Sequence, residues 1–220
     1  MHFEILVEDP SGKKALDILM PKIISDKDTF NVVDYRGIGH IPKNLKSPTD
    51  VNKRILLNHL PRLLRGFGKT FANYPTNFPA AVIVICDLDN KCLKTFRQEL
   101  FKVLNSCNPK PETRFCIAIE EGEAWLLGDI PAIKAAYPKA KSNILNSYQN
   151  DLICGTWETL ADAIFKGGLS ALLKLKRQLG GHVIGREKSA WAEKITPYMD
   201  VDKNKSQSFC YFRDKIRELI

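Results

Sequence analysis

The sequence predicts an α/β protein with a mostly parallel sheet of about four strands, flanked by helices and followed by a helical C-terminal region. Three observations predict this fold. Short apolar runs rich in β-branched residues recur along the first half of the chain, helix-like segments separate them, and strand signals end after Glu123. Alternating strands and helices are typical of parallel strands joined by right-handed crossovers.

The predicted strands share apolar composition and are bounded by turn residues. They cover residues 3–7, 30–33, 80–86 and 115–119. The third run reads Ala-Ala-Val-Ile-Val-Ile-Cys, with no polar alternation, as expected for a strand buried on both faces. We therefore expect it at the centre of the sheet.

The predicted helices show apolar residues at helical spacing. The first helix starts at Ser11. The others cover residues 50–64, 94–104, 156–179, 188–195 and 209–220. Ser11 is the predicted cap of the first helix, which Pro21 kinks or ends. Pro61 is predicted to interrupt the end of the second helix.

Length and composition favour one main domain with an appendage. We expect a metal-binding α/β domain over residues 1–130 and a helical region over residues 131–220 packed on it.

The chain begins with a strand, has no signal-peptide pattern and no membrane-spanning run, so a cytoplasmic location is expected. Its six cysteines form no C-x-x-C pair, which favours reduced thiols. The net charge of +8 is compatible with a polyanionic partner, although a solvated lysine-rich surface explains it equally well.

Carboxylates follow three of the four predicted strands. Glu8 comes after the first strand, Asp87 and Asp89 after the third, and Glu123 shortly after the fourth. In an open parallel sheet, ligands bind at the carboxyl ends of the strands. Crowded carboxylates repel one another, and Mg²⁺ or Mn²⁺ relieves that repulsion. The alternative is that these acids only cap the helices that follow. We predict a divalent-metal site.

Two motifs carry a resemblance to known families. Residues 7–11, Val-Glu-Asp-Pro-Ser, followed later by the strand that ends in Asp87-Leu88-Asp89, resemble the Toprim fold of topoisomerases, primases and OLD-type nucleases. Residues 118–129, which contain Glu-Ala-Trp, and the segment 191–209 resemble a bacterial family of unknown function, domain of unknown function family 4276. The likeness covers nearly the whole chain. One departure is Asp9, which stands where the Toprim motif usually has glycine.

The Toprim resemblance implies roles for the acidic residues. Asp87 and Asp89 would be metal ligands, Glu8 a ligand or general acid/base, and Glu123 would complete a second metal position. Two ions about 4 Å apart would then support hydrolysis of a phosphodiester without a covalent nucleophile. All four residues are thus expected to be catalytic.

Arg36 and His40 lie in a loop that contains two glycines and are candidates for contacting a substrate phosphate. A structural turn with a solvated arginine is the alternative. The predicted function is a Mg²⁺-dependent, Toprim-like nuclease or phosphodiester-processing enzyme that acts on nucleic acid. The resemblance to OLD-type relatives implies a role in phage defence beside a separately encoded ATPase. A non-catalytic nucleic-acid- or protein-binding regulatory module, suggested by Asp9, is the alternative.

Two other motifs carry less weight: a P-loop is rejected, and a haloacid-dehalogenase phosphatase is a third, weaker alternative. Residues 66–70, Gly-Phe-Gly-Lys-Thr, end like a P-loop, but the first glycine of that pattern would fall at Leu63 and a predicted helix precedes them. Asp87 and Asp89 match the nucleophile and acid/base pair of haloacid-dehalogenase phosphatases. That motif has Thr or Val two residues after the second Asp, where this chain has Lys91.

Overall fold

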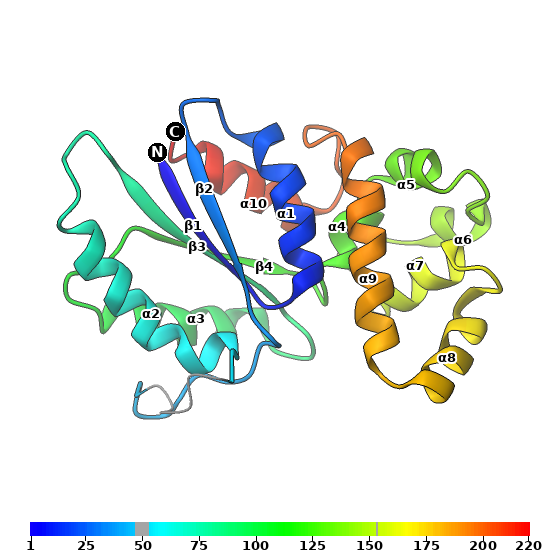
Figure 1. The fold of residues 1–220 in the computed structure, drawn as a ribbon, viewed down its shortest axis with the longest axis horizontal. Helices are drawn as coiled ribbons and strands as arrows, with labels where there is room; N and C mark the ends of the chain where they lie inside the picture. The colour runs from blue at the N-terminus through cyan, green and yellow to red at the C-terminus, as the bar shows by residue number, and fades with distance from the viewer. Residues whose placement is uncertain (47–52, 153) are drawn as a thin grey trace.

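The computed structural model describes residues 1–46, 53–152 and 154–220. It is an α/β fold with one four-stranded sheet. The strands are β1 (His2–Val7), β2 (Thr29–Asp34), β3 (Ala80–Asp87) and β4 (Thr113–Ala118). All neighbouring pairs are parallel, and the order across the sheet is β2-β1-β3-β4 (Figure 1). The predicted fold class and the four predicted strands are confirmed.

Helices cover both faces of the sheet. They are α1 (Pro10–Ile23), α2 (Leu56–Phe71), α3 (Leu93–Asn105), α4 (Glu123–Leu127), α5 (Ile130–Ala136), α6 (Ser142–Ser147), α7 (Thr156–Ile164), α8 (Gly168–Leu179), α9 (His182–Ile195) and α10 (Gln207–Arg217), with a 3₁₀ turn η1 (Thr196–Tyr198). α2 and α3 lie on one face, whereas α1 and α10 lie on the other (Figure 1).

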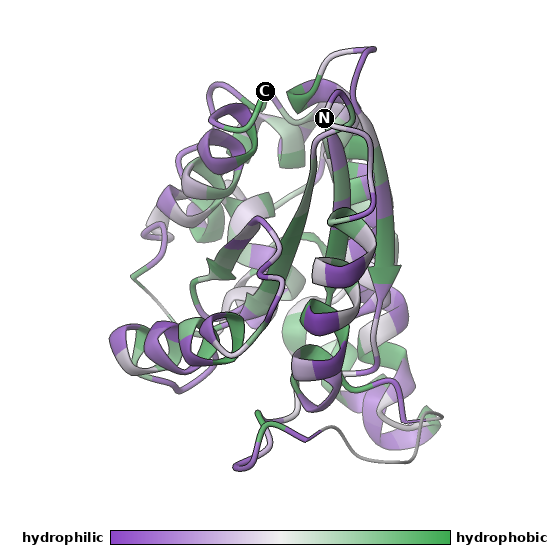
Figure 2. Ribbon diagram, turned by 90° about the vertical axis from the view of Figure 1, so that its left-hand side faces the viewer, coloured by the Kyte–Doolittle hydropathy of each residue, from purple (hydrophilic) through white to green (hydrophobic). Residues whose placement is uncertain are grey.

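The buried side chains form two hydrophobic clusters, one on each face of the sheet. On β3, Val82 and Val84 point toward α2 and α3, whereas Ile83 and Ile85 point toward α1 and the C-terminal helices. Such burial of both faces explains why this strand reads as a continuous apolar run. The strands are mostly hydrophobic, although β1, β2 and β4 each include polar residues, while the surrounding helices alternate along their turns (Figure 2).

The C-terminal helices are packed on the sheet domain. α9 runs along α1, and α10 packs against β4 (Figure 1). Phe209 and Phe212 of α10 are fully buried in the same cluster as Phe3 of β1. The region beyond residue 130 therefore shares its hydrophobic core with the sheet.

Several helix boundaries differ from the sequence prediction. Asp9, not Ser11, caps α1, because Pro10 occupies the first helical position and the Asp9 carboxylate accepts from the backbone N–H of Gly12 at 2.7 Å. α2 continues ten residues beyond Pro61 to Phe71. Its buried apolar face, which includes Leu60 and Leu64, offsets the lost backbone hydrogen bond of the proline.

The second predicted helix starts later than expected: residues 53–55 are not helical, and residues 50–52 lie outside the described part. Residues 66–70, the rejected P-loop candidate, lie inside α2. The single helix predicted over residues 156–179 is two, α7 and α8, separated at Gly167, whose φ is +86°. α9 begins six residues earlier than predicted.

Cys86 and Cys116 are buried free thiols, as predicted, and burial raises the pKa of Cys116 to about 12. No helix in the described ranges combines the length and apolar character that crossing a bilayer would require.

Candidate functional site

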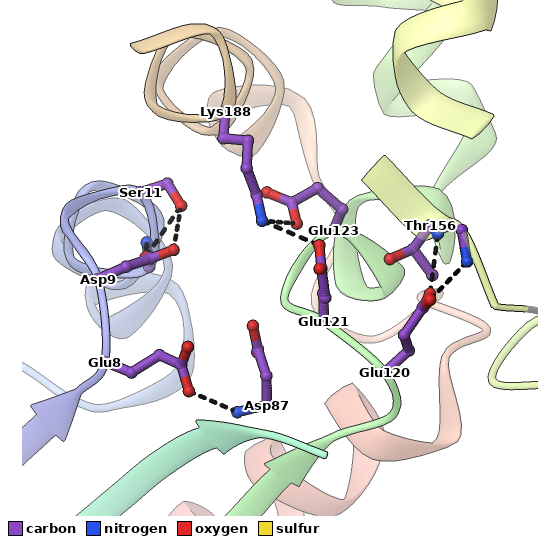
Figure 3. A network of polar contacts seen from close by, with 11 residues as sticks. Glu8, Asp9, Ser11, Asp87, Glu120, Glu121, Glu123, Thr156 and Lys188 are labelled. Carbon is purple, nitrogen blue, oxygen red and sulfur yellow. Dashed lines mark hydrogen bonds and ion pairs between the residues drawn. The ribbon is translucent and has the colours of Figure 1, made fainter. Parts of the chain in front are cut away.

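Carboxylates from two strand ends meet at the C-terminal edge of the sheet. Glu8 directly follows β1, and Asp87 is the last residue of the neighbouring strand β3. The backbone N–H of Asp87 donates to Oε2 of Glu8 at 3.1 Å, and the two side chains face each other (Figure 3). The parallel register therefore brings together two residues that are far apart in sequence, as the strand-end argument predicted.

Burial and mutual repulsion make both carboxyl groups hard to ionise. Burial raises the pKa of Glu8 to about 7, and the negative charges of Asp9 and Asp89 add to this effect. Burial, followed by the charges of Glu8 and Glu123, raises the pKa of Asp87 well above its usual range. A cation placed at this edge of the sheet would relieve the repulsion.

Glu123 joins the site from the first turn of α4 and is 3% exposed. Lys188 of α9 reaches it, with Nζ 2.9 Å from Oε2 of Glu123 and 2.9 Å from Oε2 of Glu121 (Figure 3). The Lys188–Glu123 contact is short enough for an ion pair, but the direction of approach is unfavourable for a hydrogen bond. We call Glu8, Asp87, Glu121 and Glu123 the acidic cluster.

Lys188 supplies the counter-charge of the acidic cluster. Burial opposes its charged form, but the carboxylates of Glu123 and Glu121 raise the pKa of Lys188 above its usual range. Burial also raises the pKa of Glu123 to about 7, even though Lys188 acts in the opposite direction. The lysine therefore stays charged at neutral pH, and the cluster is only partly neutralised.

α4 has five residues, too few to be stable alone, and the C-terminal segment holds it in place. The indole N–H of Trp125 donates to Oγ of Ser208 at 3.1 Å, and its ring stacks on Phe212 with centroids 5.0 Å apart. Nδ2 of Asn204 donates to the Trp125 carbonyl at 2.8 Å. These contacts fix the helix that carries Glu123.

Gly128, just beyond α4, allows this close approach. A Cβ at this position would lie 2.1 Å from Oδ1 of Asn204 and 2.8 Å from the backbone N of Ser206. The Gly128 carbonyl accepts from the N–H of Lys205 at 2.9 Å. The glycine in the Trp-Leu-Leu-Gly stretch is therefore required by contact with the chain before α10.

The neighbouring acids Asp9 and Glu120 are engaged in helix capping. Asp9 accepts from the N–H of Gly12 and from the hydroxyl of Ser11, at the start of α1. Glu120 accepts from the N–H groups of Gly155 and Thr156, at 2.5 and 2.8 Å, at the start of α7 (Figure 3). Capping therefore accounts for these two carboxylates, whereas it does not account for Glu8, Asp87 or Glu123.

Asp89 stands apart from the acidic cluster in this conformation. Its φ is +49°, its side chain is 43% exposed, and it pairs with Lys91 at 3.2 Å. Its charge still acts on Glu8. The Asp-x-Asp pair therefore sends one carboxylate into the site and the other toward solvent, and the predicted ligand role of Asp89 needs a change of its side-chain conformation.

Arg36 and His40 lie in the loop after β2, which is tied to the site by its backbone. The N–H of Gly37 donates to the Glu8 carbonyl at 2.8 Å. Both side chains are exposed, and within the described ranges neither makes a hydrogen bond or ion pair with the acidic cluster. The loop is therefore adjacent to Glu8, while the predicted phosphate contact stays a prediction.

A cavity of about 40 Å³ opens beside the acidic cluster, between α1, α4 and the strand ends. Glu8, Asp87 and Glu123 line one part of it, and apolar side chains that include Leu16 and Trp125 line the rest. A buried water needs about 10–15 Å³, so the cavity has room for a few water molecules or one ion.

The donor set fits a hard cation, although the geometry is not that of a preformed cage. Among the described residues, no three histidine, cysteine, aspartate or glutamate side chains are grouped closely enough to hold a metal ion. Mg²⁺ commonly takes one or two carboxylates and completes its shell with water. Glu8 and Asp87 satisfy that requirement, whereas Oε2 of Glu123 already pairs with the ammonium group of Lys188 at 2.9 Å.

Sequence reasoning missed Lys188 and Glu121. The acidic run 120–123 signals that a counter-charge is needed, but the chain has 33 lysines and arginines, and nothing in the sequence distinguishes Lys188 from the others.

Comparison with known proteins gives no relative: no protein-family model, no curated protein and no solved structure matches this chain.

Proposed function

We propose that this protein is a Mg²⁺-dependent nuclease or related phosphodiester-processing enzyme of Toprim-like type. The observation that carries the proposal is the half-buried pair of Glu8 and Asp87 at adjacent strand ends, joined by the 3.1 Å hydrogen bond from Asp87 N–H to Glu8. Burying two carboxylates side by side costs stability, and neither is used as a helix cap. Such a cost is typical of functional sites.

The residues have distinct roles in the proposed reaction. When bound, Mg²⁺ supplies charge stabilisation for the leaving oxygen and lowers the pKa of a water ligand. Asp87 and Glu8 hold the ion, with Mn²⁺ as an alternative. Where Glu8 does not bind the ion, it is instead suited to accept or return a proton, because burial raises its pKa to about 7. Glu123 provides a third oxygen ligand beside them.

The proposal is tested by cleavage of supercoiled plasmid, single-stranded DNA and RNA with Mg²⁺ or Mn²⁺. We expect cleavage by the wild type and a loss of about 100-fold or more in Asp87→Asn, because catalytic groups of this kind contribute on that scale. Asp26→Asn, at an exposed position, is the matched control and keeps full activity. Equal activity in wild type and Asp87→Asn contradicts the proposal.

A metal-binding measurement separates the ligands. We expect the paramagnetic signal of Mn²⁺ to report binding to the wild type, weaker binding to Glu8→Gln and Asp87→Asn, and unchanged binding to Asp26→Asn. The variant Asp89→Asn tests whether the exposed Asp89 side chain turns toward the ion. If it does, this variant binds Mn²⁺ more weakly than the wild type; if it does not, binding is unchanged.

A non-catalytic binding or regulatory module is the second candidate, and Lys188 favours it. Its ammonium group already pairs with both Glu121 and Glu123, so part of the negative charge of the acidic cluster is compensated without a metal. Under this alternative, calorimetry detects binding of nucleic acid or protein that EDTA does not affect, and no substrate is cleaved. The separately encoded ATPase and a role in phage defence remain predictions that rest on the resemblance.

A further inference from the structure

A basic stretch without acidic residues lies in the helical C-terminal region. Residues 163–186 contain five lysines and arginines and no aspartate or glutamate. They cover the end of α7, the turn before α8, α8 itself, the turn after it and the start of α9. All five basic side chains are exposed: Lys166, Lys174, Lys176, Arg177 and Arg186. We call these five residues the basic hairpin.

The charges of the basic hairpin are largely uncompensated. Within the described ranges, its ion pairs are limited to Arg186 with the adjacent Glu187, at 3.6 Å. Other lysines that face the same region are paired, such as Lys141 with Asp162 at 3.1 Å. Unpaired like charges that lie near one another repel, and an anionic partner would relieve this repulsion.

The helix dipole explains only part of this pattern. Lys176 and Arg177 lie in the last turn of α8, where positive charge is favourable. Lys166 precedes the N-terminus of the same helix, where positive charge is unfavourable. The basic hairpin is therefore not simply a means of stabilising α8.

The end of the basic hairpin that lies on α9 is close to the acidic cluster. α9 begins at His182 and carries Lys188 six residues later. At a rise of 1.5 Å per residue, the start of α9 lies only about 9 Å along the helix axis from Lys188. α9 thus connects the hairpin to the strand ends (Figure 1). Duplex DNA carries one negative charge per about 1.7 Å of its axis, so a bound duplex would present several phosphates over that distance.

We propose that the basic hairpin binds the phosphate backbone of double-stranded DNA and holds it beside the acidic cluster, an inference that rests on the proposed nuclease function. Single-strand-binding surfaces use exposed aromatic side chains as stacking platforms. Between residues 163 and 186 the aromatic side chains are Phe165, which is partly buried, and His182, so this stretch has no series of exposed stacking platforms. Helices that lie on membranes expose a broad apolar face, whereas in residues 163–186 Leu172 of α8 and Val183 of α9 are fully buried and Leu179 alone is a strongly exposed large apolar side chain.

The test compares two triple charge reversals in the full chain. One variant replaces Lys174, Lys176 and Arg177 by glutamate. The control replaces three exposed lysines by glutamate, on α2, on α3 and after α3: Lys69, Lys102 and Lys110. The probe is a fluorescent DNA duplex of about 30 bp, which is long enough to extend past both the basic hairpin and the acidic cluster. Affinity is measured in EDTA across a series of salt concentrations, so that no cleavage interferes.

We expect the hairpin variant to lose about 100-fold in affinity at 0.1 M salt and its log–log salt slope to fall by about 2–3, as the loss of three phosphate contacts predicts. The control variant loses far less. Equal losses in the two variants overturn the proposal, because they would report net charge alone. Unchanged affinity in the hairpin variant, or wild-type binding to anionic vesicles or duplex RNA in preference to duplex DNA, also overturns it.

The outcomes separate this inference from the proposed function. If the wild type binds the duplex through the hairpin but never cleaves it with Mg²⁺ or Mn²⁺, the binding surface stands and the nuclease proposal fails. If the wild type cleaves and the hairpin variant cleaves with an unchanged KM, the nuclease proposal stands and the binding surface fails.

Discussion

The substitution Glu8→Gln should make the metal-free protein more stable at alkaline pH. Burial raises the pKa of Glu8 from 4.5 to about 7, so the folded state holds this proton more tightly than the unfolded state. A shift of about 2.5 units at 1.36 kcal/mol per unit gives about 3 kcal/mol of destabilisation once the carboxyl group is ionised. Glutamine keeps an oxygen that can accept from the N–H of Asp87 and carries no charge.

The pH dependence follows from the sign of the shift. Below pH 4.5 the carboxyl group is protonated in both states, and the wild type and Glu8→Gln differ little. Between pH 4.5 and 7 the folded wild type binds more protons than the unfolded chain, so its stability falls as pH rises. Above pH 7 the full difference is present. For a chain of this length, about 3 kcal/mol corresponds to about 6–12 °C in Tm.

The assay is thermal unfolding in EDTA from pH 4 to pH 9. Glu99→Gln, at an exposed position on α3, is the control and should lie within about 0.5 kcal/mol of the wild type. Adding Mg²⁺ should stabilise the wild type and have less effect on Glu8→Gln, because the ion binds the folded carboxylate. A variant that is less stable than the wild type at pH 8, or a gap that does not change with pH, refutes the reasoning.

Three further predictions concern the parts that hold the site together. Lys188→Met should cost about 3–5 kcal/mol in urea unfolding at pH 8, because it leaves Glu123 buried without its partner, and adding Glu123→Gln should restore part of the loss. Gly128→Ala should cost about 1–3 kcal/mol in the same assay, because its Cβ would meet Asn204; equal stability would mean that the segment shifts freely. Ser208→Ala should cost about 1–3 kcal/mol by leaving a buried indole N–H unpaired, and a red shift in tryptophan emission would report the loosened contact.

Strand prediction succeeded because the strands are short apolar runs and the central strand β3 is buried on both faces, even though the edge strand β2 is largely exposed. A run such as residues 80–86 is apolar at every position, which leaves little ambiguity. Helix boundaries were harder, since capping depends on which side chain reaches the first backbone N–H groups. Asp9 and Ser11 are equally plausible caps by residue type, and only the position of Pro10 separates them.

For the site, the sequence identified the residues that follow strands, and less well those that lie on loops. Glu8 and Asp87 meet because adjacent parallel strands end at the same edge, a relation that the strand pattern contains. The direction of the Asp89 side chain depends on a positive φ in the turn, which the residue type does not determine. Lys188 lies on α9, about a hundred residues after Asp87 in the sequence. Only the packing of α9 along α1 therefore reveals its role.

The position of Lys188 also changes how the acidic cluster should respond to metal. An ion held by Glu8 and Asp87 would sit near an ammonium group that already pairs with Glu121 and Glu123. The two cations repel each other, so Lys188 weakens metal binding unless it moves or an anion comes between them. A substrate phosphate is such an anion, since it can contact the metal on one side and the ammonium on the other. The geometry therefore favours metal and substrate binding together over strong binding of metal alone, and it makes the helical C-terminal region a part of the site.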